Sequence, residues 1–156
     1  MKGNDKVIQA LNGLLRFELA AMDQYFIHAR MYDDWGLEKL RDRIDHEFDD
    51  EKRHASALIE RMLFLEGVPD LVTREPLQIG KNVPEMLQSD LNVELAVGAA
   101  LKDAIALCED ENDYVTREIL EQLLEDTEVD HAWWLEKQLG LIDKVGLQNY
   151  LQSQMG

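Results

Sequence analysis

The chain has 156 residues, 46% of them apolar, which is enough for one globular domain with a sizeable core. We therefore expect a single domain over residues 1–156. The sequence contains 32 Asp and Glu against 16 Lys and Arg, so its formal net charge is −16. This acidity argues against binding to nucleic acid or to an anionic membrane, because both would be repelled, and makes cations the more natural partners.

Cysteine content and the first residues bear on the expected compartment. Cys108 is the only cysteine, which excludes an intrachain disulfide. The opening MKGNDKVIQ lacks the apolar core of a signal peptide, and no run approaches the roughly 18 apolar residues of a membrane helix. We therefore expect a reducing, cytoplasmic setting.

The first half of the chain predicts two long helices. Apolar residues recur at helical spacing over residues 7–29 and again over residues 37–65, on either side of the polar break Asp33-Asp34-Trp35-Gly36. Gly67 is expected to end the second helix. All three prolines then fall within residues 69–84, which predicts a non-helical connection there.

The second half repeats this layout. Two more helices are expected over Met86–Cys108 and Tyr114–Leu139, the latter ending at Gly140, and an amphipathic tail over residues 147–155 predicts a short fifth helix. Each long helix would span roughly 40 Å. The 17 residues from Gly67 to Val83 can extend to about 55 Å, which is longer than the bundle. The predicted fold is all-α: a four-helix bundle with one long crossover and a short fifth C-terminal helix.

Two of the four histidines end a Glu-x-x-His motif, Glu51–His54 and Glu128–His131. Residues i and i+3 share a face of an α-helix, so each motif offers one carboxylate and one imidazole to the same point. The motif by itself is weak, because glutamate is abundant in this sequence.

The spacing of two further glutamates strengthens the pattern. Glu18 precedes Glu51 by 33 residues, and Glu94 precedes Glu128 by 34. Each predicted helix thus carries one element of the order Glu, Glu-x-x-His, Glu, Glu-x-x-His, between 15 and 18 residues from its hairpin turn. In two antiparallel hairpins, all four elements meet at the middle of the bundle.

Apolar neighbours indicate that these carboxylates face inward. The helix faces around Glu18 and Glu94 are mostly apolar and carry no Lys or Arg. Burying a carboxylate without a partner is costly, whereas two divalent ions would neutralise four glutamates. Carboxylates and imidazoles without thiolate favour iron or manganese over a closed structural zinc site. The alternative at this point is that the glutamates lie on solvated faces.

Three stretches, MYDDWGLEKL, IERMLFLEGVP and GLQNYLQSQM, carry a family likeness together with Glu18, Tyr25, Asp50, Glu51, His54, Glu94, Glu128 and His131. On these residues nearly the whole chain resembles bacterioferritin, within the ferritin-like superfamily. The resemblance implies a 24-subunit cage for iron storage and detoxification. Such a cage oxidises Fe(II) with dioxygen or hydrogen peroxide at a di-iron centre inside each subunit, and deposits ferric mineral in its cavity.

Carried over residue by residue, the resemblance implies two iron ions per subunit, held by six ligands. One iron would have Glu18 and His54 as terminal ligands, the other Glu94 and His131, and the two bridging ligands would be Glu51 and Glu128.

The resemblance also implies roles for residues around the centre. Tyr25 would be a hydrogen-bonding or electron-donating neighbour, and a core tyrosine is an equal alternative. His46 and Asp50 match an inner-surface iron site of some members. By themselves these two residues favour a solvated polar face.

Lys52 departs from the family pattern. Bacterioferritins bind haem between two subunits through a methionine directly after the bridging glutamate of the second helix, and Lys52 occupies that position. An ammonium has no lone pair for iron. We therefore expect no methionine-ligated haem from this subunit alone, and either a haem-free cage or a mixed 24-mer with a haem-binding subunit. A small ferredoxin is the reductant that the resemblance implies, although its docking face in the family is the haem-bearing one.

Two other functions remain open from the sequence. The first is a rubrerythrin-like di-iron peroxidase or small oxygenase on the same scaffold; rubrerythrins usually add a four-cysteine iron site, which a single cysteine excludes. The second is a non-catalytic acidic helical binding module, which would bind no iron.

Overall fold

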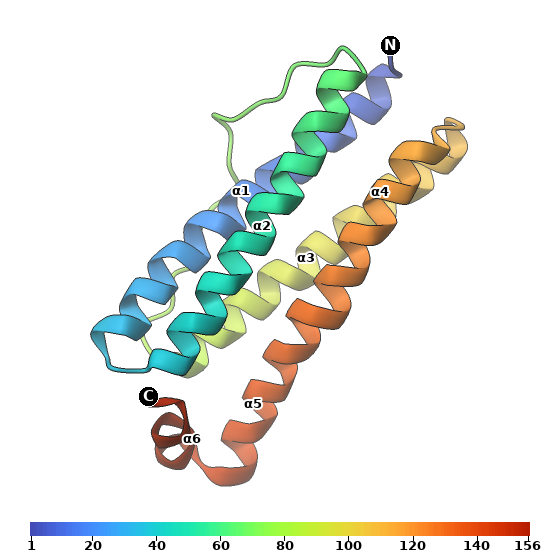
Figure 1. Ribbon diagram of the computed structural model, residues 1–156. Coiled ribbons are helices and arrows are strands. Elements are labelled where there is room, and N and C mark those ends of the chain that lie inside the picture. The colour runs from blue at the N-terminus through green and yellow to red at the C-terminus, as the bar shows by residue number, and fades with distance from the viewer.

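The protein is described by a computed structural model of all 156 residues, in which every regular element is helical (Figure 1). The elements in chain order are α1 (Asp5–Asp34), α2 (Glu38–Phe64), α3 (Val83–Asp110), α4 (Tyr114–Glu125), the π-helical segment η1 (Asp126–Ala132), α5 (Trp133–Val145) and α6 (Leu147–Gln154). The segments α4, η1 and α5 run on as one long helix. The predicted all-α bundle of four long helices and a short fifth one is thereby confirmed. None of the helices has the length and apolar character needed to cross a membrane.

Side-chain caps define where the helices begin. The Asn4 side chain accepts hydrogen bonds from the first free N–H groups of α1, and Asn82 and Asp113 do the same for α3 and α4. With Asn82 as cap and Pro84 in the first turn, α3 starts at Val83, three residues before the predicted Met86.

Residues in the left-handed conformation end two of the helices. Glu66, with φ of 61°, lets the Gly67 N–H bond to the Met62 carbonyl at 2.8 Å, so Glu66 rather than Gly67 takes the left-handed position after α2. Asn112, with φ of 57°, does the same after α3, where Asp113 N–H bonds to Cys108 at 2.8 Å.

The predicted end of the fourth helix at Gly140 is wrong. The helix continues to Val145 and stops before Gly146, whose φ of 83° suits glycine. A glycine within a helix costs only about 1 kcal/mol relative to alanine, and the apolar pattern continues beyond it, so Gly140 does not break the helix.

The crossover returns along α1 (Figure 1). Its backbone is hydrogen-bonded to that helix at well-separated positions: Asp70 N–H donates to Asn12 at 2.9 Å, and Gln78 N–H donates to Gln24 at 3.1 Å. This path connects the far end of α2 to the start of α3, as the predicted crossover requires.

The apolar core has two parts, one at each end of the bundle. One cluster of 15 buried residues includes Leu15 and Leu58, and a second cluster of 14 includes Tyr25 and Ile44. Buried acidic and histidine side chains, among them Glu18, Glu51 and Glu94, lie along the helices between the residues of the two clusters. The middle of the bundle is therefore the one layer of its core that is charged.

Candidate metal centre

The charged layer contains five of the six predicted ligands. Each of them is at most 3% exposed; they are Glu18 from α1, Glu51 and His54 from α2, Glu94 from α3 and His131 from η1. Four helices thus each contribute at least one of these side chains to the same buried place.

The five side chains form two groups that share one carboxylate. His54 Nδ1 lies 3.3 Å from Glu18 and 3.5 Å from the Oε2 atom of Glu51. His131 Nδ1 lies 3.1 Å from the Oε1 atom of Glu51 and 3.2 Å from Glu94. The ligand atoms of each group lie within 4.8 Å of one another, which suits one metal ion per group. Glu51 presents one oxygen to each, which is the position of a bridging carboxylate.

Most of the donor atoms at this centre make no aligned hydrogen bond to another protein group. Both oxygens of Glu18 and Glu51, one oxygen of Glu94 and Nδ1 of His54 are buried without a properly aligned hydrogen bond. Buried polar atoms are almost always satisfied, so such a concentration of free carboxylate oxygens favours a site for cations. The oxygen-rich set with two imidazoles fits iron.

Protons compensate part of the charge in the protein without metal. Burial raises the pKa of Glu18 well above its usual value, and the nearby Glu51 charge adds to this. Burial lowers the pKa of His54, but its contacts with Glu18 and Glu51 outweigh that effect and raise it to about 11. Burial also lowers the pKa of His131, but contacts with Glu47, Glu51 and Glu94 outweigh burial and raise this pKa well above its usual value.

Tyr25 lies directly beside the centre. Its hydroxyl donates a hydrogen bond to Glu94 Oε1, and the side chain is fully buried. Burial and the Glu94 charge raise the pKa of Tyr25, so the phenol keeps its proton and acts as a donor. Tyr25 therefore lies against a predicted ligand and is at the same time a fully buried core side chain.

Glu128 is the predicted ligand that the structure does not bring to the centre. Its side chain is 49% exposed and pairs with Lys102 at 2.8 Å. The prediction assumed α-helical geometry, in which i and i+3 share a face, but Glu128 and His131 both lie in η1. The i→i+5 hydrogen bonding of a π-helix widens the turn, so the two side chains diverge: His131 points inward and Glu128 outward.

A third acidic group lies on the far side of His131. It consists of Glu47, Asp50, Asp130 and His131, and the exposed His46 approaches it with Nε2 3.2 Å from Asp50. Both residues of the predicted inner-surface site therefore belong to one cluster that adjoins the centre.

Sequence reasoning missed Glu47, Asp126 and Asp130. Glu47 was detectable, because it lies on the same helical stripe as Glu51 and His54 at i, i+4 and i+7. Asp126 directly follows α4 with α-helical backbone angles, whereas Asp130 lies inside the wide turn of η1, for which the sequence carries no comparable signal.

A second buried network lies next to the centre on α1 and α3. His28 places Nδ1 2.9 Å from Asp90, while its Nε2 accepts from the Gly80 N–H at 3.2 Å. Gln24 donates to the same Asp90 oxygen at 2.8 Å. Since Nε2 is an acceptor, Nδ1 carries the proton that is donated to Asp90. These bonds fasten the crossover to both helices.

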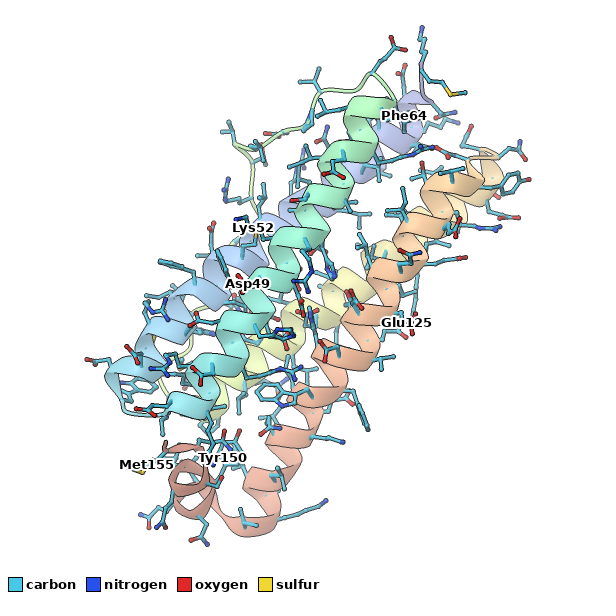
Figure 2. All side chains as sticks on the ribbon, in the orientation of Figure 1. Asp49, Lys52, Phe64, Glu125, Tyr150 and Met155 are labelled. Carbon is cyan, nitrogen blue, oxygen red and sulfur yellow. The ribbon has the colours of Figure 1, made fainter.

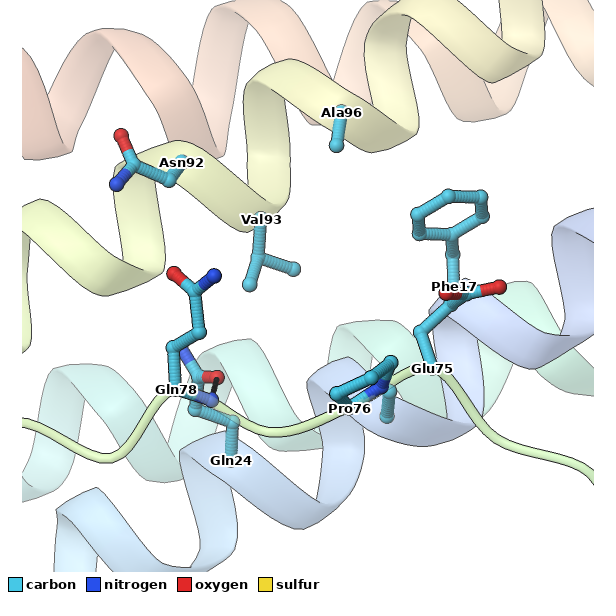
Figure 3. Close-up of a pocket in the computed structure, with 9 residues that line it drawn as sticks. Phe17, Gln24, Glu75, Pro76, Gln78, Asn92, Val93 and Ala96 are labelled. Atoms are coloured by element: carbon cyan, nitrogen blue, oxygen red, sulfur yellow. Dashed lines mark hydrogen bonds between the residues drawn. The ribbon is translucent and has the colours of Figure 1, made fainter.

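A pocket of about 210 Å³ opens on this flank between α1, α3 and the crossover (Figure 3). Its walls are mainly apolar and amide side chains: Phe17, Ala20, Gln24, Glu75, Pro76, Gln78, Asn92, Val93 and Ala96. None of the predicted ligands lines it, so the charged layer and not this pocket is the candidate site.

Fold and site together define a class. A four-helix bundle with one crossover, in which buried glutamates and two histidines from four helices meet at mid-length, is the architecture of di-metal carboxylate proteins.

Comparison with known proteins gives the family. The ferritin-like domain matches residues 8–145. The chain is 65% identical over 155 residues to a bacterial ferritin of Synechocystis sp., with 99% of each chain covered, and 56% identical to that of Pseudomonas aeruginosa, covering 99% of this chain and 100% of the relative. It is 42% identical to a bacterioferritin of Brucella melitensis, covering 97% and 94%. The chain belongs to the ferritin family, in its bacterioferritin branch, whose function is iron storage with ferroxidase activity.

Proposed function

We propose that this chain is a ferroxidase subunit that oxidises two Fe(II) ions at the centre between its four helices and passes the ferric product to storage. The observation that carries the proposal is the position of Glu51, whose two oxygens face two separate carboxylate–histidine groups. Two Fe(II) ions held side by side supply together the two electrons that reduce dioxygen to hydrogen peroxide, or peroxide to water.

The residues of the chain hold and neutralise the substrate ions. Glu18 and His54 are proposed as terminal ligands of one iron, and Glu94 and His131 of the other, with Glu51 between them. The fixed negative charge of these groups in a buried layer stabilises the increase in charge from Fe(II) to Fe(III). The Tyr25 hydroxyl holds Glu94 in place through its hydrogen bond.

Glu128 is proposed as the second bridging ligand. For this it leaves Lys102 and turns inward, and its exposed ion pair is of the kind that holds a side chain by at most about 1 kcal/mol. The free energy of binding a metal ion that still needs one carboxylate ligand exceeds the free energy of this ion pair.

The assembly is proposed to be a 24-subunit cage without methionine-ligated haem from this subunit. Lys52 is exposed on α2, at the position where the family's methionine would be (Figure 2). Either a homopolymer or a mixed cage with a haem-binding subunit follows, with dioxygen or peroxide as oxidant and a small ferredoxin as candidate reductant. His46 and Asp50 are proposed to receive iron on the inner surface, and the chain is proposed to act as one domain in the cytoplasm.

The test is to measure Fe(II) oxidation by the purified cage, using the absorbance of the ferric product to monitor the reaction. We expect two Fe(II) per subunit to be oxidised in a fast phase, and Glu94→Ala to remove that phase because it deletes a ligand and the acceptor of Tyr25. Glu60→Ala, an exposed glutamate on α2, is the matched control and should behave as wild type. Rapid oxidation by the Glu94→Ala variant would contradict the assignment.

Particle mass, iron content and haem content separate the alternatives. A 24-mer that loads iron without haem supports the proposal. A dimer with peroxidase activity would indicate the rubrerythrin-like enzyme, and a chain that takes up no iron would indicate the binding module, although buried carboxylates without partners argue against the latter.

A further inference from the structure

His54 is held from both sides of its ring. Nδ1 faces Glu18 and Glu51 at 3.3 and 3.5 Å, and Nε2 lies 3.1 Å from Asp126 Oδ2, in hydrogen-bonding geometry. The ring itself is buried. His54 is on α2 and Asp126 is the first residue of η1, so this contact joins two helices.

A metal ligand needs a bare nitrogen, and the second nitrogen of the ring decides which one that is. When Nε2–H donates to a carboxylate, the proton stays on Nε2 and the lone pair of Nδ1 points the other way. In His54 that direction is toward Glu18 and Glu51. The Asp126 carboxylate thus selects both the tautomer and the ring orientation that a metal at this group requires.

His131 has the same arrangement, but its ring lies on η1 and the carboxylates that contact its Nε2 lie on α2. Nε2 of His131 in η1 lies 2.6 Å from Glu47 and 3.1 Å from Asp50, both of α2. The rings of His54 and His131 stack at 5.8 Å with an interplanar angle of 21°. Each helix therefore contributes one imidazole to the centre and orients the imidazole of its neighbour.

We propose that Asp126 is a positioning residue, which holds His54 with Nδ1 toward the first metal group and does not itself touch the metal. The inference rests on the proposed di-iron function and adds a residue to it that the ligand pattern does not contain. The regular end of α4 brings Asp126 to His54, since the Asp126 N–H still bonds to the Gln122 carbonyl four residues back, while His131 reaches the centre from η1.

Cobalt(II) binding to the metal-free cage tests the proposal without any turnover. Titration followed by visible absorption and calorimetry should resolve two ions per wild-type subunit. In Asp126→Leu, which removes the acceptor, we expect affinity for one ion to fall by about tenfold and affinity for the other to change by less than about twofold. Asp126→Asn keeps an oxygen that accepts from Nε2–H and should restore binding to within about threefold of wild type.

The control is Glu125→Leu, which removes the adjacent exposed acid of α4 without touching His54 and should bind both ions as wild type does (Figure 2). Unchanged binding by Asp126→Leu would overturn the proposal. An equal loss in Asp126→Asn would also overturn it, because the charge and not the hydrogen bond would then matter. Failure of the wild type to bind a pair of ions would overturn the proposed function as well, so the two failures are distinguishable.

Discussion

Replacing Glu18 by glutamine should make the metal-free protein more stable and the metal-loaded protein less stable than wild type. Glu18 is fully buried, with neither oxygen in a well-formed hydrogen bond. A buried polar group without a partner costs about 1–3 kcal/mol, and glutamine relieves this cost by donating its amide to the free oxygens of Glu51. For a chain of this size, that gain raises Tm by about 2–12 °C.

The stabilisation of the metal-free protein by Glu18→Gln should increase with pH. Burial raises the pKa of Glu18 above its unfolded value of 4.5, so the folded state binds a proton more tightly than the unfolded chain. The resulting stability is fully present below pH 4.5 and is lost as pH rises through the folded pKa. Glutamine does not titrate, so the advantage of Glu18→Gln should be small in acid and larger at neutral pH.

Bound metal should reverse the order of stability, so that wild type becomes more stable than Glu18→Gln. An ion at 100 times its dissociation constant stabilises the folded protein by about 2.7 kcal/mol, and wild type gains this at both groups. Glu18→Gln loses a charged ligand at one of them and gains less. Thermal unfolding of the cage, with and without cobalt(II) at several pH values, measures all three effects, with Glu60→Gln as a control for an exposed site. A lower Tm for metal-free Glu18→Gln than for wild type, or equal stabilisation of both by metal, would refute the reasoning.

Three further predictions follow from other parts of the structure. His28→Ala should lower the free energy of unfolding by about 1–3 kcal/mol in denaturant titrations, because buried Asp90 loses one of its two hydrogen-bond donors and the Gly80 N–H loses its acceptor; a change below about 0.5 kcal/mol would contradict this. Metal binding should release protons near pH 7, since the pKa of His54 is about 11 and the imidazole must lose a proton to bind; cobalt(II) added in a pH-stat should require base, and affinity should rise with pH. Cys108, whose pKa burial raises to about 11, should not react with a thiol reagent at pH 8 until the protein is unfolded, and rapid labelling of the native cage would show that the thiol is accessible.

Much of the fold could be predicted because the information is local. Apolar residues at helical spacing, and the polar breaks between them, define helices through contacts within a few residues of each position. The confinement of all prolines to residues 69–84 placed the crossover correctly. Gly140 misled the prediction, because a glycine marks a helix end only where the chain needs a left-handed residue, and here that residue is Gly146.

Much of the site could be predicted for a related reason. Glu18, Glu51, His54 and Glu94 lie on regular α-helices, where spacing along the chain determines which side chains meet across a hairpin. Those four residues lie together as the spacing indicated. Glu128 does not lie with them, because its position was inferred for an α-helix and the chain forms a π-helical turn there.

The sequence by itself determined that this protein is a four-helix bundle with carboxylates and imidazoles at mid-length, since helix periodicity and residue spacing are properties of the chain. Only the tertiary structure decided which acids orient the imidazoles and where Glu128 points. Asp126 and His54 are 72 residues apart, and His28 and Asp90 are 62. Partners so distant are chosen by how the helices pack, and a widened turn in one helix changes which side chains face its neighbour.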